Sequence, residues 1–119
     1  MAHPLRIGLK LSQQVHPIDA QREAWRMADD AGFDHIWPFD HLIALGNDPT
    51  RLIFDGWTVL GALAENTKRA RIGLNVTGNL YRHPGLLAQR LRRSDQPGSP
   101  PRVAALRENA REQLDHVDG

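Results

Sequence analysis

The sequence predicts an α/β fold built on a parallel sheet, and two observations lead to this class. Short apolar runs typical of buried strands alternate with amphipathic stretches typical of helices across the first 89 residues. Glycine, proline and polar residues separate these segments at the spacing expected of strand–helix units. With 119 residues and a formal net charge of +1, the chain has the composition of an ordinary globular domain.

Composition also excludes several classes of function. The chain has no cysteine, so disulfides, thiolate metal sites and cysteine nucleophiles are excluded, and its histidines lack metal-ligand spacing. The near-neutral charge gives no basic surface for a nucleic acid or an anionic membrane. The apolar stretch at residues 7–11 is interrupted by Lys10 and is too short for a signal peptide or a membrane span. We therefore expect a cytoplasmic chain without a metal, nucleic-acid or membrane partner.

The first strand–helix unit is expected within residues 5–32. Apolar residues with a period of two predict a strand over residues 5–11. Asp19 is the expected N-cap of the following helix, and Gly32 fits the position just past its end. Small and apolar residues recur on one face of that helix: Ala20, Ala24, Met27, Ala28 and Ala31.

The second unit begins with an apolar run at residues 33–41, which predicts the second strand. A long loop at residues 42–54 follows, and its length is typical of a functional segment. Asp55 is expected to cap a helix over residues 56–64. The apolar positions of that helix are Trp57, Leu60, Leu63 and Ala64.

The third unit comprises a strand at residues 71–76, an exit segment at residues 77–83 and a helix that starts at Pro84. The pattern then changes, because residues 90–119 are rich in arginine and proline and lack isoleucine and aromatic residues. We expect one domain over residues 1–89 and an atypical tail over residues 90–119, either disordered or holding an amphipathic helix. Its apolar positions would be Val103, Leu106, Ala110, Leu114 and Val117.

Polar side chains that follow the strands are the candidates for chemistry, since barrel enzymes carry their sites at the carboxyl ends of strands. Asp40 and His41 follow the second strand, and histidine changes charge near neutral pH. The alternative is a polar cap on a buried strand, with His41 hydrogen-bonded to a nearby loop. Gln13, after the first strand, is the candidate for the substrate side, whereas Trp37 and Trp57 are expected in the core.

Several short motifs across residues 5–89 form one pattern: Ile7-Gly8-Leu9, Ala31-Gly32-Phe33-Asp34, Trp37 with Asp40-His41, Gly56-Trp57, and Arg71-Ile72-Gly73-Leu74 through Tyr81-Arg82-His83-Pro84. In order and spacing they resemble the N-terminal part of the bacterial-luciferase-like family of flavin- and deazaflavin-dependent oxidoreductases. The resemblance implies a partial TIM (β/α)8 barrel, because a complete barrel takes about 250 residues and this chain could supply its first three βα units. After residue 89 the family pattern is lost, as in a truncation, a frameshift or an internal deletion.

The resemblance also implies a function, namely hydride transfer between coenzyme F420 and a small-molecule substrate, with FMN-dependent monooxygenation as the alternative. It places Asp40 against the cofactor ring and His41 beside the position of hydride transfer. It further implies a cis peptide at Asn75–Val76 behind the ring. Five residues after the third strand would contact the cofactor: Asn75, Val76, Thr77, Gly78 and Asn79. Without the resemblance, this segment is the end of a central strand followed by a glycine turn.

A second class of function remains open on the same residues. Three parallel strands leave two open edges and an uncovered face, which favours pairing with another chain. The chain could therefore be a non-catalytic remnant or an interaction module, with homo-oligomers formed through the open edges.

Overall fold

The computed structural model describes residues 3–46 and 48–94. In this part of the chain the strands alternate with helices in the predicted order. The elements are β1 (Gly8–Lys10), α1 (Ile18–Asp30), β2 (His35–Trp37), α2 (Gly56–Asn66), β3 (Arg71–Ile72), the 3-10 helix η1 (Asn79–Tyr81) and α3 (Pro84–Ser94). The predicted tail helix, over residues 103–117, lies outside the described residues. Helix α3 extends to Ser94, into the segment expected as tail.

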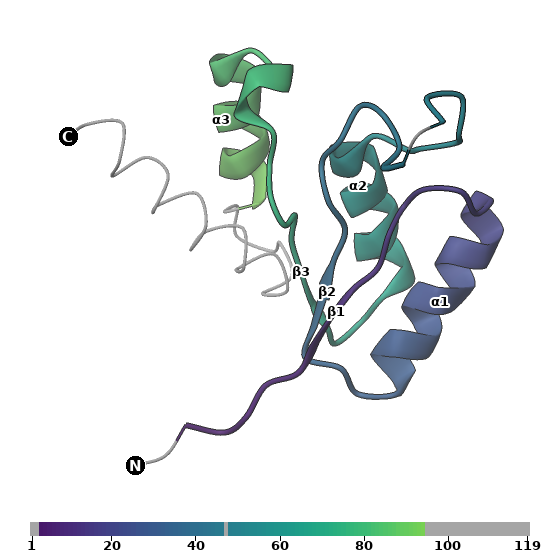
Figure 1. The fold of residues 1–119 in the computed structure, drawn as a ribbon. Coiled ribbons are helices and arrows are strands. Elements are labelled where there is room, and N and C mark those ends of the chain that lie inside the picture. The colour runs from purple at the N-terminus through teal and green to yellow at the C-terminus, as the bar shows by residue number, and fades with distance from the viewer. Residues whose placement is uncertain (1–2, 47, 95–119) are drawn as a thin grey trace.

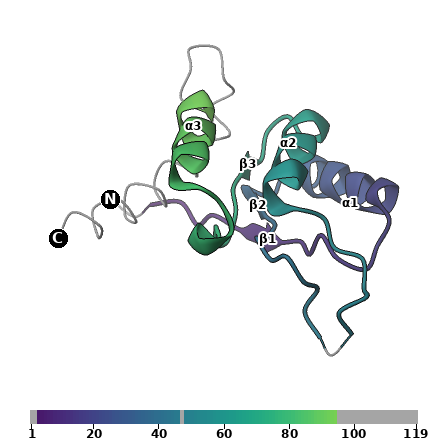
Figure 2. The same ribbon diagram turned by 90° about the horizontal axis from the view of Figure 1, so that it is seen from above.

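The three strands form a parallel sheet in the order β1-β2-β3, which confirms the predicted α/β class. Gly8 pairs with His35, and His35 pairs in turn with Arg71. Helices α1 and α2 lie together on one face of this sheet, and α3 lies beyond β3 (Figures 1 and 2). Helix α3 reaches the same core, because Leu87 packs against it and the guanidinium of Arg90 lies 5.7 Å from the centroid of the Trp57 ring. The described helices therefore leave the other face of the sheet bare.

The core lies between the sheet and the helices α1 and α2. Ile36 of β2 and Leu63 of α2 are fully buried there, and Trp25 of α1 packs beside them at 2% exposure. Ile72 brings β3 into the same cluster. Burial of large side chains such as these, each worth about 1.5–3 kcal/mol, fixes the helices on the sheet.

Helix α1 buries a different face from the one expected. Its buried residues are Gln21, Trp25, Ala28 and Asp29, whereas Ala20, Ala24, Met27 and Ala31 are exposed. The pattern of alanines was misleading because alanine removes little apolar area from water, and the large Trp25 ring decides which face turns inward. The predicted cap is also wrong, since the N-cap is Pro17 and Asp19 lies in the first turn. Gly32 does follow the helix with φ of 86°.

Helix α2 begins as predicted. The carboxylate of Asp55 accepts a hydrogen bond from the backbone N–H of Thr58 at 2.9 Å, which confirms Asp55 as the N-cap. Trp57, Leu60 and Leu63 are buried, as expected from their spacing. The helix extends beyond the predicted residue 64 to Asn66.

The bare face of the sheet carries Trp37, which was expected in the core. Side chains alternate along a strand, so Ile36 points to the helices and His35 and Trp37 point away from them. A Cβ atom at Gly73 would lie 2.5 Å from the Trp37 ring, so glycine makes room for the indole on the neighbouring strand. His35 stacks on Trp37 with ring centroids 5.8 Å apart.

A buried carboxylate joins α1 to β3 at the opposite end of the strands from the predicted site. Asp29 accepts hydrogen bonds from the backbone N–H groups of Lys68, Arg69 and Ala70 at 2.7, 2.9 and 2.6 Å. Burial raises the pKa of the Asp29 carboxyl, but these three bonds and the charge of Arg69 outweigh burial, and the pKa lies below its ordinary value. The ionised carboxylate thus fixes the turn that leads into β3.

Candidate functional site

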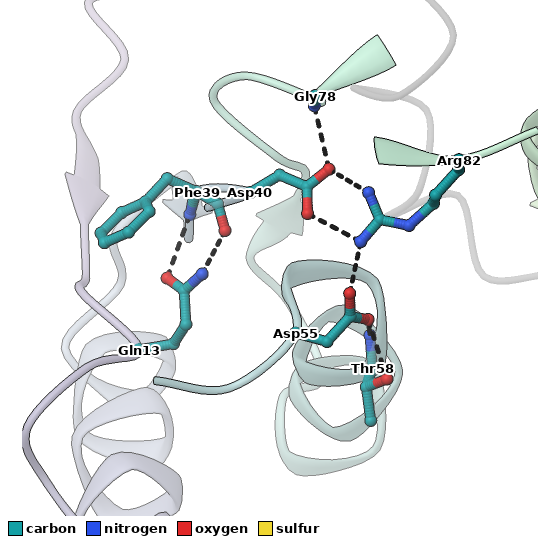
Figure 3. A network of polar contacts seen from close by, with 7 residues as sticks. All are labelled: Gln13, Phe39, Asp40, Asp55, Thr58, Gly78 and Arg82. Carbon is teal, nitrogen blue, oxygen red and sulfur yellow. Dashed lines mark hydrogen bonds and ion pairs between the residues drawn. The ribbon is translucent and has the colours of Figure 1, made fainter. Parts of the chain in front are cut away.

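The segments that follow β2 and β3 meet at the carboxyl edge of the sheet. Asn75 donates its backbone N–H to the carbonyl of Pro38 at 2.9 Å. Further along, Gly78 donates its backbone N–H to Oδ2 of Asp40, also at 2.9 Å (Figure 3). Asp40, at the end of β2, and Gly78, in the exit of β3, are therefore brought together at this edge.

Asp40 is buried, and its partner is Arg82, a residue of the Tyr81-Arg82-His83-Pro84 motif for which no function was predicted. The Asp40 side chain is 1% exposed, and Arg82 binds both of its oxygens, with Nη2 2.8 Å from Oδ1 and Nη1 bonded to Oδ2. Burial lowers the pKa of the Arg82 guanidinium, but bonds and charges from Asp40 and Asp55 outweigh this and raise it above its ordinary value. A carboxylate expected at the end of a buried strand needs a cationic partner. This requirement is the signal in the sequence that could have pointed to a residue such as Arg82.

Asp55 extends the network to helix α2 (Figure 3). Its Oδ2 caps Thr58, while its Oδ1 accepts a hydrogen bond from Nη2 of Arg82. Burial raises the pKa of the Asp55 carboxyl, but the bonds from Thr58 and Arg82 outweigh it and hold the pKa below its ordinary value. One guanidinium therefore connects the end of β2 to the start of α2.

Glycine at position 56 allows this close approach. A Cβ atom on Gly56 would lie 2.6 Å from the carbonyl oxygen of Phe39 and 3.0 Å from Oδ1 of Asp40. A side chain there would collide with backbone, which cannot move aside without shifting the strand end. The first turn of α2 thus lies directly against Phe39 and Asp40.

Gln13 lies at this edge, but its side chain is committed to the main chain. It is 1% exposed, its Oε1 accepts from the N–H of Phe39 at 3.2 Å, and its Nε2 donates to the carbonyl of Phe39 (Figure 3). The amide therefore fixes the backbone just before Asp40. Contact between Gln13 and a substrate stays a prediction.

His41 is half-buried and meets the ring of Phe39 edge-on, with centroids 4.9 Å apart. Within residues 3–46 and 48–94 no side chain or backbone group hydrogen-bonds its imidazole, so the bond to a neighbouring loop considered as an alternative is absent there. The chemical function of His41 stays a prediction.

The exit of β3 supplies backbone rather than buried side chains. The Asn75–Val76 peptide is cis, as the family resemblance implied. Asn75 and Val76 are exposed, Thr77 and Gly78 are half-buried, and Asn79 begins η1. The Tyr81 ring lies so near Gly78 that a Cβ atom there would be 2.3 Å from it. These five residues are together at the edge, and their contact with a cofactor stays a prediction.

The long loop after His41 pairs with the loop that follows β1. Ile53 forms a bridge with Gln14, and the N–H of Val15 donates to the carbonyl of Leu52 at 2.8 Å. Val15 has φ of 73°, which is strained for a β-branched residue and is held by this pairing. The two loops thus form one unit beside Gln13.

A surface hollow of about 360 Å³ lies at the other end of the strands, so it is separate from the candidate site. Its walls are Arg6, Gly32, Phe33, Asp34, His35, Arg69 and Arg71. In the described part of the chain, no group of His, Asp and Glu side chains could hold a metal ion. None of its helices is long and apolar enough to cross a membrane.

Comparison with known proteins gives one family and several relatives. The sequence profile of the family described as luciferase-like monooxygenase matches residues 1–93. An F420-dependent glucose-6-phosphate dehydrogenase from Microbacterium testaceum is 35% identical over 94 residues, which cover 75% of this chain and 26% of that protein. An F420-dependent hydroxymycolic acid dehydrogenase from Mycobacterium tuberculosis is 30% identical over 84 residues, or 70% of this chain and 23% of that protein.

A solved structure gives the same picture. An F420-dependent secondary alcohol dehydrogenase in complex with an F420–acetone adduct superposes with a TM-score of 0.66 at 27% identity. The match covers 79% of this chain and 29% of that one. The chain therefore spans about a quarter of the length of the curated relatives it matches.

Proposed function

This chain belongs to the luciferase-like monooxygenase family, and we propose that it forms the first three βα units of a barrel oxidoreductase that transfers hydride with coenzyme F420. The named relatives are F420-dependent dehydrogenases, and the structural neighbour holds an F420 adduct. Both findings support F420 over FMN. A small organic molecule would be the substrate.

One observation carries the proposal, namely that the Asp40–His41 segment and the exit of β3 are joined by the bond between Gly78 and Asp40. At this edge Thr77 and Gly78 are half-buried, and so is His41. Such an edge fits a flat polar ring, because backbone groups can bind its rim while His41 holds or accepts a proton.

When bound, F420 would supply the hydride chemistry itself. The residues of this chain would bind and orient the ring, and the contacts would come from the segment after β3: Asn75, Val76, Thr77, Gly78 and Asn79. Asp40 would support this segment through its carboxylate, which is bound to Arg82 and to the backbone N–H of Gly78. His41 would be the catalytic residue.

A second candidate is a non-catalytic interaction module. It is favoured by apolar side chains exposed just before the open edge of β1, since Leu5 is 87% and Ile7 54% exposed. The bare face of the sheet points the same way. On this alternative, homo-oligomers would form through the open edges.

Titration of the purified chain with F420 and separately with FMN distinguishes the candidates. We expect saturable changes in absorbance and fluorescence with F420 and weaker changes with FMN. A stronger response to FMN would favour the monooxygenase alternative. Unchanged spectra with both cofactors would exclude cofactor binding by this chain and leave the interaction module.

A further inference from the structure

We infer that Arg82 is the positioning residue of the candidate site, and that it fixes the Gly78 backbone through the buried carboxylate of Asp40. The inference deepens the proposed function, on which its consequence for cofactor binding rests. Its first part, the placement of Gly78, concerns the chain by itself. The two parts can therefore fail separately.

The contact between Arg82 and Asp40 has the geometry of a strong charged pair. Two guanidinium nitrogens bind the two carboxylate oxygens, and the exposed fractions of the side chains are 8% for Arg82 and 1% for Asp40. Parallel bonds of this kind fix orientation as well as distance. Lysine carries the same charge but presents a point charge, so it cannot reproduce the paired bonds.

The carboxylate that Arg82 orients also binds the loop after β3. Its Oδ2 accepts from the N–H of Gly78 at 2.9 Å while it is also bonded to Arg82 (Figure 3). Without the guanidinium, Asp40 would be a buried charge without a cation, a state strongly disfavoured in proteins. The carboxylate would then turn toward water or bind a proton, and Gly78 would lose its acceptor.

Asp55 binds the guanidinium of Arg82 as well, at the nitrogen Nη2 that also donates to Oδ1 of Asp40. Its Oδ2 accepts a hydrogen bond from the backbone N–H of Thr58 at the start of α2, and its Oδ1 accepts one from Arg82. The Asp55 side chain is 39% exposed, so this second pair is the weaker of the two. Arg82 is thus fixed from α2, and it fixes Asp40 in turn.

The test is backbone amide hydrogen exchange measured by NMR on the full chain. In Arg82→Lys we expect the Gly78 amide to exchange at least tenfold faster, while amides in the core such as Leu63 keep their rates. Arg22→Lys is the matched control, because Arg22 pairs with Asp19 on the exposed surface of α1. This control should leave Gly78 unchanged.

Two further variants keep the inference falsifiable if Arg82→Lys does not fold. Asp55→Asn retains a capping oxygen for Thr58 but removes the charge that faces Arg82, so Gly78 should exchange faster by a smaller factor. In Arg82→Ala, millimolar guanidinium added to the solution should slow the exchange of Gly78 again. Unchanged Gly78 exchange in a folded Arg82 variant, or in Asp55→Asn where no Arg82 variant folds, would overturn the inference.

The consequence for the cofactor is measured separately. If the wild-type chain binds F420, Arg82→Lys should raise the dissociation constant for F420 at least tenfold, and equal affinity would refute this second part of the inference. If the wild-type chain does not bind F420, the proposed function fails. The placement of Gly78 by Arg82 is then decided by amide exchange alone.

Discussion

Asp40 and His41 are neighbours in the sequence, yet their side chains have different surroundings. Asp40 is buried with both oxygens bonded, whereas His41 is half-buried beside Phe39. A carboxylate that already accepts bonds from Arg82 and Gly78 has little capacity left to move a proton. On the proposed function, proton transfer at this edge would therefore fall to the imidazole of His41.

For His41→Ala we expect the rate of hydride transfer to fall at least tenfold while the affinity for F420 changes little. The reason is that the imidazole would act on the reacting atoms rather than hold the cofactor. Rates with reduced and oxidised cofactor measure the first quantity, and fluorescence titration the second. His16→Ala is the control, since His16 contributes its backbone carbonyl to Gln21. An unchanged rate in His41→Ala would remove His41 from the mechanism.

Asp29 predicts how stability depends on pH. Its folded pKa lies below the ordinary value of 3.8, so its contribution to the free energy of unfolding is complete above pH 3.8 and is lost as the pH falls through the folded pKa. Asp29→Asn should lower that free energy by about 1–3 kcal/mol near neutral pH, because an amide cannot accept all three N–H bonds.

Urea unfolding at a series of pH values measures this effect. The difference between wild type and Asp29→Asn should shrink as the pH falls below 3.8. Asp30→Asn is the control, since the Asp30 side chain is exposed and its backbone carbonyl, which receives Arg69, is retained. A difference that stays constant down to the acid transition would show that the charge of Asp29 does not stabilise the turn.

At the scale of elements, the approach of α2 to the strand end depends on Gly56. Gly56→Ala should lower the free energy of unfolding by about 1–3 kcal/mol, because its Cβ would collide with the carbonyl of Phe39. Gly61→Ala in the same helix has nothing within 4 Å of its Cβ and should instead raise stability by about 0.5–1 kcal/mol. Chemical denaturation of both variants measures the contrast, and equal effects would refute the close approach.

The order and type of the elements could be predicted from the sequence, because they depend on local patterns. The cap at Asp55 and the helix start at Pro84 are of this kind. The buried face of α1 could not be predicted from its alanines, because burial depends on what the helix packs against. Trp25 meets the core there, and Asp29 meets the turn before β3.

The candidate site divides in the same way. The carboxyl ends of parallel strands share one edge, so the meeting of Asp40 with Gly78 followed from topology. The partner of Asp40 is Arg82, which lies 42 positions along the chain, and no local pattern pairs residues at that separation. The hydrogen bond between the side chain of Gln13 and the backbone of Phe39 could not be predicted for the same reason, because the two residues are far apart in the sequence.

At the scale of the molecule, the described sheet has free edges at β1 and β3. Ile7 is 54% exposed just before β1, next to the free edge of that strand. We expect the chain to associate as its concentration rises, as measured by sedimentation velocity. Ile7→Lys should weaken association, whereas Ala24→Lys on the exposed side of α1 should not. Monomers at all concentrations would show that these edges do not pair.

The fluorescence of Trp37 can report on the bare face of the sheet, because Trp37 lies on that face. Trp25 and Trp57 are buried in the core, so they emit from a constant environment, whereas Trp37 is half-buried on the face that the described helices leave bare. Whatever covers that face, another chain or a ligand, should shift the tryptophan emission to shorter wavelength. The shift should disappear in Trp37→Phe. Trp37 would therefore act as an intrinsic fluorescent reporter of any partner that covers this surface.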